Sequence, residues 1–484
     1  MDERPDIPYA VPKASTEPLP EIAEFLEPFA PLFRRSQSRH SLERYVTGLL
    51  TDLDRKNCDT IAAAVAGTST ERLQHLLTDA DWDSKELDGA RVRSLSAKSP
   101  EGGVLVIDDT SFPKQGKSSV GVARQYCGAL GKRANCQVVV SGEYVADEPE
   151  SPRPLHWPVS GRLYLPEEWA TDRERRGISH VPGGVIFRSK PDVALSLVDL
   201  SQEWEVPFEM VVADSGYGKY PSFLGGLEER ELSYVCGVES TFGVRLPEEV
   251  RAAKEAGAPP YQGRGQPPKE RPAPLYTAGE LIGSLPEGAW RTVSWREGTK
   301  GTLSKQMVAL RAHRARGSDR HSTDHERVIT AAEGWLIAER PPPGSPSSAH
   351  KKNEGEEELK YYYSSLGAEV SLGHLASSAK SRWAIEQFYE DAKGECGLSD
   401  YQGRRWDGLH RHLALSMLAY SFLMLHSSVT SGAGGSSISG GEVFFPLGQA
   451  HDASGDPQAG AGVAAGGPSA MVRPNREDQN LPAS

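Results

Sequence analysis

Residues 103–110 read Gly-Val-Leu-Val-Ile-Asp-Asp-Thr, and our prediction of the fold starts from this stretch. Its apolar run is typical of a strand that is covered on both faces of an α/β sheet. The strand leads directly into Asp108 and Asp109. Because successive side chains of a strand point to opposite faces, we expect only one of these two carboxylates to face a common site.

A second apolar run ends in acid in the same way. Residues 210–214 read Met-Val-Val-Ala-Asp, and a helical pattern follows at residues 220–231. Further compact apolar runs at residues 138–140 and 234–238 complete the pattern of an α/β region. Open α/β sheets bind ligands at the carboxyl ends of their strands, which is where Asp214 stands. The alternative is that Asp214 only caps a following helix.

A third carboxylate belongs to a predicted helix late in the chain. Between residues 381 and 396 apolar side chains recur at helical spacing, with Arg382, Glu386 and Lys393 on a stripe beside them. Glu386 thus stands at the edge of the buried face, where a carboxylate needs a partner or a cation. A surface ion pair between Arg382 and Glu386, worth about 0.3–0.5 kcal/mol, is one interpretation, and a metal site is the other.

Three carboxylates from two strand ends and one helix suit a hard cation such as Mg²⁺, which takes oxygen ligands and keeps several waters. Two such ions about 3.5–4 Å apart can activate an attacking oxygen and stabilise a leaving oxygen in a phosphodiester displacement. The sequence contains no P-loop, no His-Glu-x-x-His and no Gly-x-Ser-x-Gly motif. These absences argue against an ATPase, a zinc protease and a serine hydrolase.

The texture of the sequence divides the chain into six segments. We predict a disordered N-terminus at residues 1–20, a helical domain at 21–100, an α/β region at 101–240, a β-rich insertion at 241–371, further helices at 372–427, and a disordered low-complexity tail at 428–484. The strand candidates in the insertion are residues 291–295, 328–331, 335–338 and 361–364.

The overall charge limits how the chain can bind nucleic acid. It has 54 Lys and Arg against 66 Asp and Glu, a formal charge of −12, which is the wrong sign for coating DNA without specificity. Any affinity for DNA must come from local basic patches, and the alternative for each patch is a solvated face. The candidates are residues 296–327, with eight Lys and Arg against four Asp and Glu, a helical-domain set of Arg34, Arg35, Arg39, His40, Arg44, Arg55 and Lys56, and a late set of Arg404, Arg405, His410, Arg411 and His412.

The compartment follows from what the sequence lacks. No apolar run approaches the roughly 18 residues that a membrane span needs, and the acidic, Pro-rich start has no secretory signal pattern. The five cysteines form no Cys-x-x-Cys pair. We therefore expect a cytoplasmic protein with reduced thiols.

Taken together, strand-Asp, strand-Asp and helix-Glu resemble the DDE insertion-sequence transposases, in the branch with a Tyr-Arg-Glu-Lys signature. Arg382, Glu386 and Lys393 match that signature in type and spacing, whereas Ala379 stands where the Tyr would be. Other similar stretches occur in the expected order over residues 29–425. They are residues 107–110, 114–116, 119–126, 135–137, 162–169, 213–218 and 397–404.

The resemblance implies an RNase H-like fold, a mixed sheet flanked by helices, with an N-terminal helical domain and a β-rich insertion before the last catalytic helix. It assigns metal binding to Asp109, Asp214 and Glu386, with Asp108 as the reserve for Asp109 because the family's acid commonly precedes Thr. Arg382 and Lys393 would lie beside the scissile phosphate. The implied cofactor is two Mg²⁺ ions, with Mn²⁺ as a substitute.

The implied activity is metal-dependent cleavage of DNA at element ends, followed by strand transfer into target DNA by a homodimer that associates with the nucleoid. Two alternatives stay open: a metal-dependent nuclease that does not join strands, and an inactive DNA-binding relic. The resemblance also suggests that Trp290, Trp295 or Trp335 stacks on a flipped base. Core packing is the alternative for each of these tryptophans.

Overall fold

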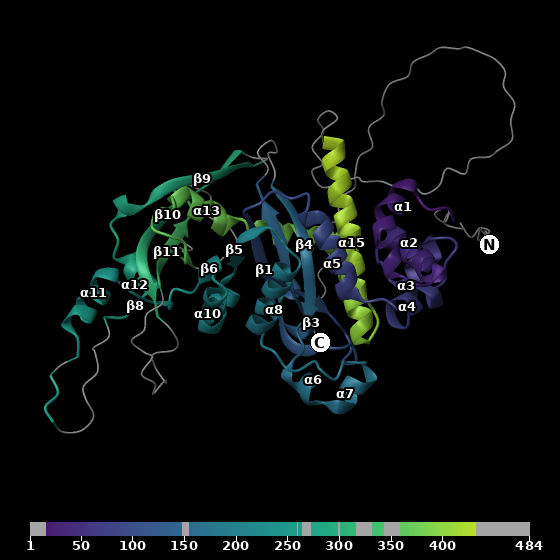
Figure 1. The fold of residues 1–484 in the computed structure, drawn as a ribbon, viewed down its shortest axis with the longest axis horizontal. Coiled ribbons are helices and arrows are strands. Elements are labelled where there is room, and N and C mark those ends of the chain that lie inside the picture. The colour runs from purple at the N-terminus through teal and green to yellow at the C-terminus, as the bar shows by residue number, and fades with distance from the viewer. Residues whose placement is uncertain are drawn as a thin grey trace, which may run out of the picture. The chain divides into compact units, whose positions relative to one another are not determined.

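The structure is a computed structural model that describes residues 16–147, 154–258, 260–263, 273–298, 301–315, 332–342 and 359–431. Most of both predicted disordered ends, and the strand candidate at residues 328–331, lie outside the described residues. The described chain contains helices and one large mixed sheet (Figure 1). The predicted mixed sheet flanked by helices is therefore confirmed.

The core of the sheet is a meander that continues into two parallel strands. Strand β1 (Gly103–Pro113) pairs antiparallel with β3 (Lys132–Ala146), which also pairs with β2 (Ala123–Cys127) and β4 (Leu155–Leu163). On its other side β1 pairs parallel with β5 (Phe208–Ala213), and β5 pairs parallel with β6 (Ser233–Val238). This order, with the first strand central, is consistent with the predicted RNase H-like fold.

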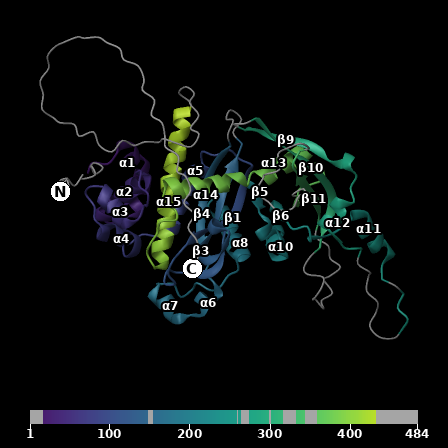
Figure 2. The ribbon, with the colours of Figure 1, turned by 180° about the vertical axis from the view of Figure 1, so that it is seen from behind.

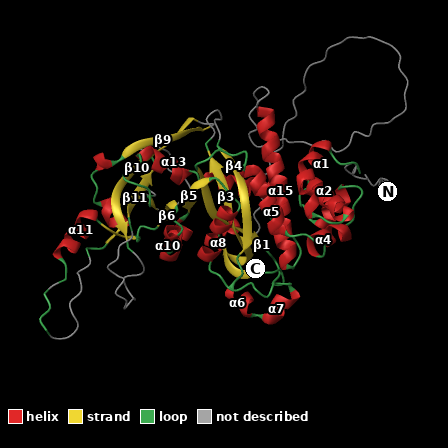
Figure 3. Cartoon of the chain, in the orientation of Figure 1, coloured by secondary structure: helices red, strands yellow, loops and turns green. Residues whose placement is uncertain are grey.

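The strands of the predicted insertion extend the same sheet (Figure 3). Strand β12 (Lys360–Ser364) pairs with β6, and β11 (Glu333–Arg340), β10 (Gly301–Arg314) and β9 (Arg291–Gly298) follow in order. The short strands β7 (Gly243–Arg245) and β8 (Tyr276–Thr277) complete that edge. Strand β10 covers part of residues 296–327, which the sequence predicted as a candidate basic patch for DNA. This strand pairs with β11 on one side and with β9 and β7 on the other. The spacing of its own residues does not predict this pairing.

Helices cover both faces of the core strands. On one face lie α14 (Trp383–Glu395) and α15 (Trp406–Ser431), and on the other lie α8 (Lys190–Glu203) and α10 (Pro221–Glu229). Figure 2 shows α14 running from α13 (Leu372–Lys380) toward α15. The remaining helices of the core and insertion are α6 (Glu167–Thr171), α7 (Arg173–Ile178), α9 (Ser215–Gly218), α11 (Pro247–Ala256) and α12 (Ala278–Gly283).

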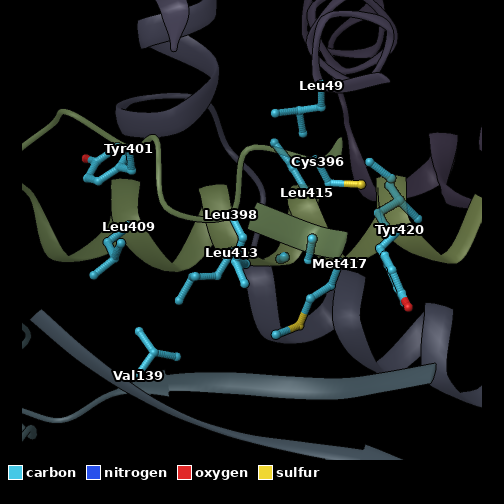
Figure 4. Packing of buried hydrophobic residues seen from close by; sticks show 14 of the residues in the cluster. Leu49, Val139, Cys396, Leu398, Tyr401, Leu409, Leu413, Leu415, Met417 and Tyr420 are labelled. Atoms are coloured by element: carbon cyan, nitrogen blue, oxygen red, sulfur yellow. The ribbon is translucent and has the colours of Figure 1, made fainter. Parts of the chain in front are cut away.

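The N-terminal helices pack against α15, and the last of them also packs against β4. They are α1 (Pro20–Leu26), α2 (Ser36–Leu50), α3 (Cys58–Ala64), α4 (Thr70–Thr78) and α5 (Ser84–Ser96). In Figure 4, Leu413 and Met417 of α15 lie between Val139 of β3 and Leu49 of α2. The helical segment therefore shares one apolar core with the sheet, and burial of this kind stabilises by about 25 cal/mol per Å² of apolar surface.

Two glycines allow α9 to approach β6 at the end of β5. A Cβ atom on Gly218 would lie 1.9 Å from the Gly237 carbonyl oxygen, and one on Gly237 would lie 2.8 Å from the Ser215 nitrogen. Both distances are shorter than van der Waals contact. This close approach fixes the backbone that carries Asp214.

We expect Gly218→Ala to lower the free energy of unfolding by about 1–3 kcal/mol, because the added methyl group must push α9 away from β6. Urea unfolding followed by circular dichroism measures the change. Gly225→Ala in α10 is the matched control, since its new Cβ would meet nothing closer than 3.9 Å. Equal unfolding midpoints for the two variants would show that the contact does not constrain α9.

None of the described helices is both long enough and apolar enough to cross a membrane. All five cysteines are free, and four of them are buried.

Candidate active site

The acids lie at the point where the pairing between β1 and β5 ends. The parallel pairing of β1 with β5 ends at the Ile107–Ala213 pair, whereas the antiparallel pairing with β3 continues as far as Pro113. The sequence suggested that Asp108 and Asp109 follow the strand. They lie inside β1 instead, because the strand continues to Pro113. Beyond Ile107 none of the described strands pairs with the β5 side of β1, and Asp214 directly follows the last residue of β5.

Strand alternation separates the two adjacent aspartates. Ser141, the partner of Asp108 on β3, donates or accepts a 2.6 Å hydrogen bond with the Tyr389 hydroxyl of α14. Asp108 itself accepts a 2.6 Å hydrogen bond from the Arg382 guanidinium, at the start of α14. The Asp108 carboxylate thus lies on the face of the sheet that α14 covers.

Asp109 has a different set of partners. Its Oδ2 atom lies 3.0 Å from Nζ of Lys190, the first residue of α8, and 3.3 Å from the hydroxyl of buried Tyr217 in α9. These helices belong to the opposite face from α14. The prediction that the two carboxylates point in different directions agrees with these contacts.

Asp214 is the residue that caps α9. Its Oδ1 atom accepts a 2.9 Å hydrogen bond from the Gly216 amide, so the capping role considered for it is present. Burial is the main reason that the pKa of Asp214 is raised, with Asp109 adding to the effect and Arg382 opposing it. Capping and membership of an acid cluster therefore coexist in the same side chain.

Arg382 links the strand acids to the helix acid. Its guanidinium forms ion pairs with both Asp108 and Glu386, four residues along the helix. The Glu386 side chain is 58 % exposed, whereas that of Asp108 is 14 % exposed. The Arg382–Glu386 pair considered as a surface interaction exists, but it is joined to a half-buried acid on β1.

Burial and the neighbouring acids raise the pKa values of the site's aspartates. Burial raises the pKa of Asp108 to about 7, with Asp214 and Asp109 adding to the shift and Arg382 opposing it. A carboxyl group held near pH 7 by burial and neighbouring acids is a common property of functional sites. A cation placed among these groups would favour their ionised forms.

The donor set fits a hard divalent cation in chemistry, although not as a closed cage. All four acids offer oxygen atoms, the ligands that Mg²⁺ prefers, and one of them is exposed enough to admit substrate. Within the described ranges, no three His, Cys, Asp or Glu side chains stand close enough together to hold a metal ion as they are. Arg382 instead supplies the positive charge between Asp108 and Glu386.

The last residue of the predicted set lies farther along α14. Lys393 is partly buried, its ammonium stands 5.7 Å from the centre of the Tyr389 ring, and burial lowers its pKa. Among the residues that the structure describes, no hydrogen bond or ion pair joins it to the acids. Ala379, at the position of the signature Tyr, is buried in the core on α13.

Many of the predicted DNA-contacting cations have partners inside the protein. Arg44 pairs with Glu43, and buried Lys56 donates to the carbonyls of Leu49 and Glu395. Arg411 donates to the carbonyls of Leu77, Ala80 and Trp82, and Arg405 pairs with Asp79 and Asp407. These contacts join α15 to the N-terminal helices, so the late set supports packing and leaves Arg404 exposed at its start.

The tryptophans of the insertion each lie against a cation. Trp290 packs under Arg340, Trp295 under Lys380, and Trp335 under Arg311. The Trp335 indole also donates a 2.8 Å hydrogen bond to the Gly367 carbonyl. These contacts favour packing roles for the three rings over stacking on a base.

Two contributors to the site were not predicted from the sequence. Tyr217 lies three residues after Asp214, in a stretch already singled out, so its position was a usable signal. Lys190 starts a helix that is far from Asp109 in sequence, and its residue type and spacing carry no signal that it would pair there. Only the packing of α8 against the sheet brings it to the acid.

Comparisons with known proteins show which family the chain resembles. A family model described as "DDE superfamily endonuclease" matches residues 28–302, and one described as "Transposase DDE domain" matches residues 189–422. The "Probable transposase for insertion sequence element IS701" of Microchaete diplosiphon is 27 % identical over 239 residues, which cover 49 % of this chain and 58 % of that protein. The chain thus spans little more than half the length of this relative.

One solved structure is also similar in part. The NurA nuclease from Sulfolobus solfataricus is 10 % identical, and the match covers 69 % of this chain and 86 % of that one. Its TM-score of 0.22 is too low to indicate a shared fold.

Proposed function

Since the chain belongs to the DDE superfamily of endonucleases, we propose that it is a transposase that cuts DNA strands at the ends of an element and joins them to target DNA. The observation that carries the proposal is the set of acids at one place in the fold. Asp108 on β1 and Glu386 on α14 pair with Arg382, and Asp214 after β5 adds to the rise in the pKa of Asp108. Asp109 lies beside Lys190 on the other face of the same strand. Two copies of the chain would hold the two element ends.

We propose that Asp214 and Glu386 are metal ligands, together with one of the two β1 aspartates. The family resemblance favours Asp109, which precedes Thr110. The contacts favour Asp108, because its carboxylate lies on the face of α14 with Arg382, whereas Asp109 contacts Lys190 from α8. The other aspartate of β1 would then be a positioning residue that holds the backbone of its neighbour and adds negative charge to the site.

The basic residues of the site have matching roles. Arg382 presents a planar guanidinium that can exchange a carboxylate for a phosphate oxygen of the scissile linkage. Lys393 supplies a compact positive charge farther along the same helix. Mg²⁺ or Mn²⁺ held by the acids would supply positive charge to the attacking and leaving oxygens of the phosphodiester.

The test is strand cleavage by the full chain. Purified protein is incubated with supercoiled plasmid that carries the element ends, in Mg²⁺, in Mn²⁺ and in EDTA. We expect strand breaks at the element ends in either metal and none in EDTA, because the acids need a cation to act on a phosphodiester. Absence of cleavage in both metals would contradict the proposal.

Joining is tested separately with pre-cut ends. Transfer of a labelled end with a free 3′-hydroxyl into a second DNA molecule is expected from a transposase, and a nuclease would cleave the plasmid without producing joined molecules. The occupation of the space between Asp108 and Glu386 by Arg382 favours a second candidate, a DNA-binding protein that no longer cleaves. That candidate predicts binding of element ends with no cleavage in either metal.

A further inference from the structure

One stretch of this acidic chain carries positive charge alone. From Thr110 to Gly142 the sequence contains no aspartate or glutamate. Its basic residues are Lys114, Lys117, Arg124, Lys132 and Arg133. Lys117, Lys132 and Arg133 are exposed. In a protein of net charge −12, such a stretch is a local electropositive surface, and it begins directly after the acids of β1.

A polar cavity of about 480 Å³ opens at the start of this stretch. It is lined by residues of two segments, 113–119 after β1 and 399–404 after α14, and by Arg55 from the N-terminal helical part. Three separate parts of the sequence therefore build it. Its walls carry guanidinium, ammonium, hydroxyl and amide groups, which are the donors that phosphate oxygens accept from.

The charges in the cavity are mostly positive and partly without partners. The side chains of Arg55 and Arg404 are exposed, and in the part of the chain that the structure describes neither forms a hydrogen bond or ion pair. Lys114 donates to the Tyr401 carbonyl at 2.6 Å, which holds its ammonium at the wall. The one acid of the lining, Asp400, already accepts a 2.8 Å hydrogen bond from the Lys56 amide.

The cavity suits a backbone phosphate rather than a base. Its aromatic residue, Tyr401, is buried and stacks on His412 with the ring centres 5.6 Å apart. The face of that ring is therefore already covered. Without a free aromatic face, the contacts on offer are electrostatic and independent of base sequence.

The cavity lies a short distance from the acids along β1. Strand β1 runs four residues from Asp109 to Pro113, a distance of about 13 Å at the usual rise of a strand. That distance corresponds to about four base-pair steps along a DNA helix. A duplex that had its scissile phosphate at the acids and followed the direction of β1 would carry the neighbouring backbone past this cavity.

We propose that Arg55, Lys114 and Arg404 form a binding site for the phosphodiester backbone of the DNA that flanks the cleavage position, continued by the basic surface of the β2–β3 hairpin. The inference rests on the proposed function, because it takes DNA at the acids as the substrate. It adds a surface that holds this DNA, and residues of both the N-terminal helical part and the core contribute to that surface.

The experiment measures DNA binding by the full chain without cleavage. A fluorescein-labelled duplex of about 30 base pairs and arbitrary sequence is titrated in EDTA at several NaCl concentrations. We expect Arg55→Ala with Arg404→Ala to weaken binding about tenfold or more near 0.1 M salt, and to reduce the slope of log K against log[salt] by about two. Both side chains are exposed, so the melting temperature should not change.

The matched control removes the same charge elsewhere. Arg251→Ala with Lys254→Ala on α11 also neutralises two exposed cations, and it should leave the affinity and the salt slope near the wild-type values. If the cavity variant bound DNA like this control, the proposed site would be wrong. An effect of the cavity variant on affinity with an unchanged salt slope would also overturn it, because phosphate contacts must release counterions.

Binding in EDTA separates this inference from the proposed function. A chain that cleaves element ends and binds DNA equally well with and without Arg55 and Arg404 would retain the function and lose this site. A chain that never cleaves, but loses affinity and salt slope in the cavity variant, would retain the site and lose the function.

Discussion

Asp214→Asn and Glu386→Gln are each expected to lower the rate of metal-dependent DNA cleavage by more than about a hundredfold. Partners of metal ligands typically cost 10- to 100-fold when removed, and a direct ligand should cost more. Each amide keeps the size of the side chain and removes the negative charge that holds a cation. Asp214→Asn also keeps an oxygen that can accept from the Gly216 amide, so the cap on α9 should survive.

The measurement is the initial rate of plasmid cleavage in Mg²⁺, with urea unfolding of each variant as a check on folding. Glu390→Gln is the matched control for Glu386→Gln, because Glu390 is exposed on the same helix one turn further on. The control should cleave at the wild-type rate. Wild-type rates for Asp214→Asn or Glu386→Gln would exclude these residues as ligands.

The same assay decides between the adjacent aspartates. If the face of the sheet determines the site, Asp108→Asn should abolish cleavage and Asp109→Asn should reduce it less, because Asp109 then acts through its neighbours. The reverse order would support the assignment from the family resemblance. Because Asp108→Asn also removes a partner of Arg382, Asp108→Glu tests whether a carboxylate at this position restores activity.

The two apolar runs were sufficient to locate the strands next to the acids. They did not show that β1 continues past its aspartates to Pro113, because that part of the strand depends on pairing with β3. The sequence also identified the helix with Arg382 and Glu386, whose spacing of four residues places them on one face. It could not place Lys190 beside Asp109, because that contact depends on how α8 packs across the sheet. Local spacing carries no information about partners that are distant in sequence.

The basic residues also show that local sequence does not predict contacts with distant parts of the chain. Arg44 and Lys56 are charged, and a charged run predicts a solvated or DNA-binding face, yet both are buried with partners in the fold. Charge alone does not distinguish a residue that binds DNA from one that joins two helices. The electropositive stretch from Thr110 to Gly142 was equally visible in the sequence, as a gap in the acids rather than as a cluster of bases.

Acid is expected to destabilise the fold through two buried histidines of α15. Burial lowers the pKa of His410 and of His412 from 6.5 to about 4. Both are neutral in the folded state at pH 6 and bind protons more readily when unfolded. Their contribution to stability is therefore fully present above pH 6.5 and is lost as the pH falls toward 4. At about 1.4 kcal/mol for each pKa unit, each histidine contributes on the order of 3 kcal/mol.

The hydrogen bonds of the two rings explain why protonation is unfavourable. His410 donates from Nδ1 to the Trp406 carbonyl, so its Nε2 must accept from the Leu163 amide at 3.4 Å. A proton on that nitrogen would place two donors face to face. His412 donates from Nε2 to the Gly397 carbonyl and accepts from the Tyr45 hydroxyl. The neutral form of each ring therefore satisfies its neighbours.

Urea unfolding between pH 4.5 and pH 7 measures the effect, and the comparison must be made between variants and wild type. Glu143 is a buried acid whose pKa is raised to about 7, mainly by burial, so its contribution falls as the pH rises and opposes that of the histidines. His410→Gln with His412→Gln removes the two histidine contributions and leaves that of Glu143. The stability of this variant should decline less than that of the wild type as the pH is lowered, whereas His75→Gln, at an exposed position on α4, should follow the wild-type curve. Parallel curves for all three proteins would mean that the histidines are already protonated, or accessible to water, in the folded chain.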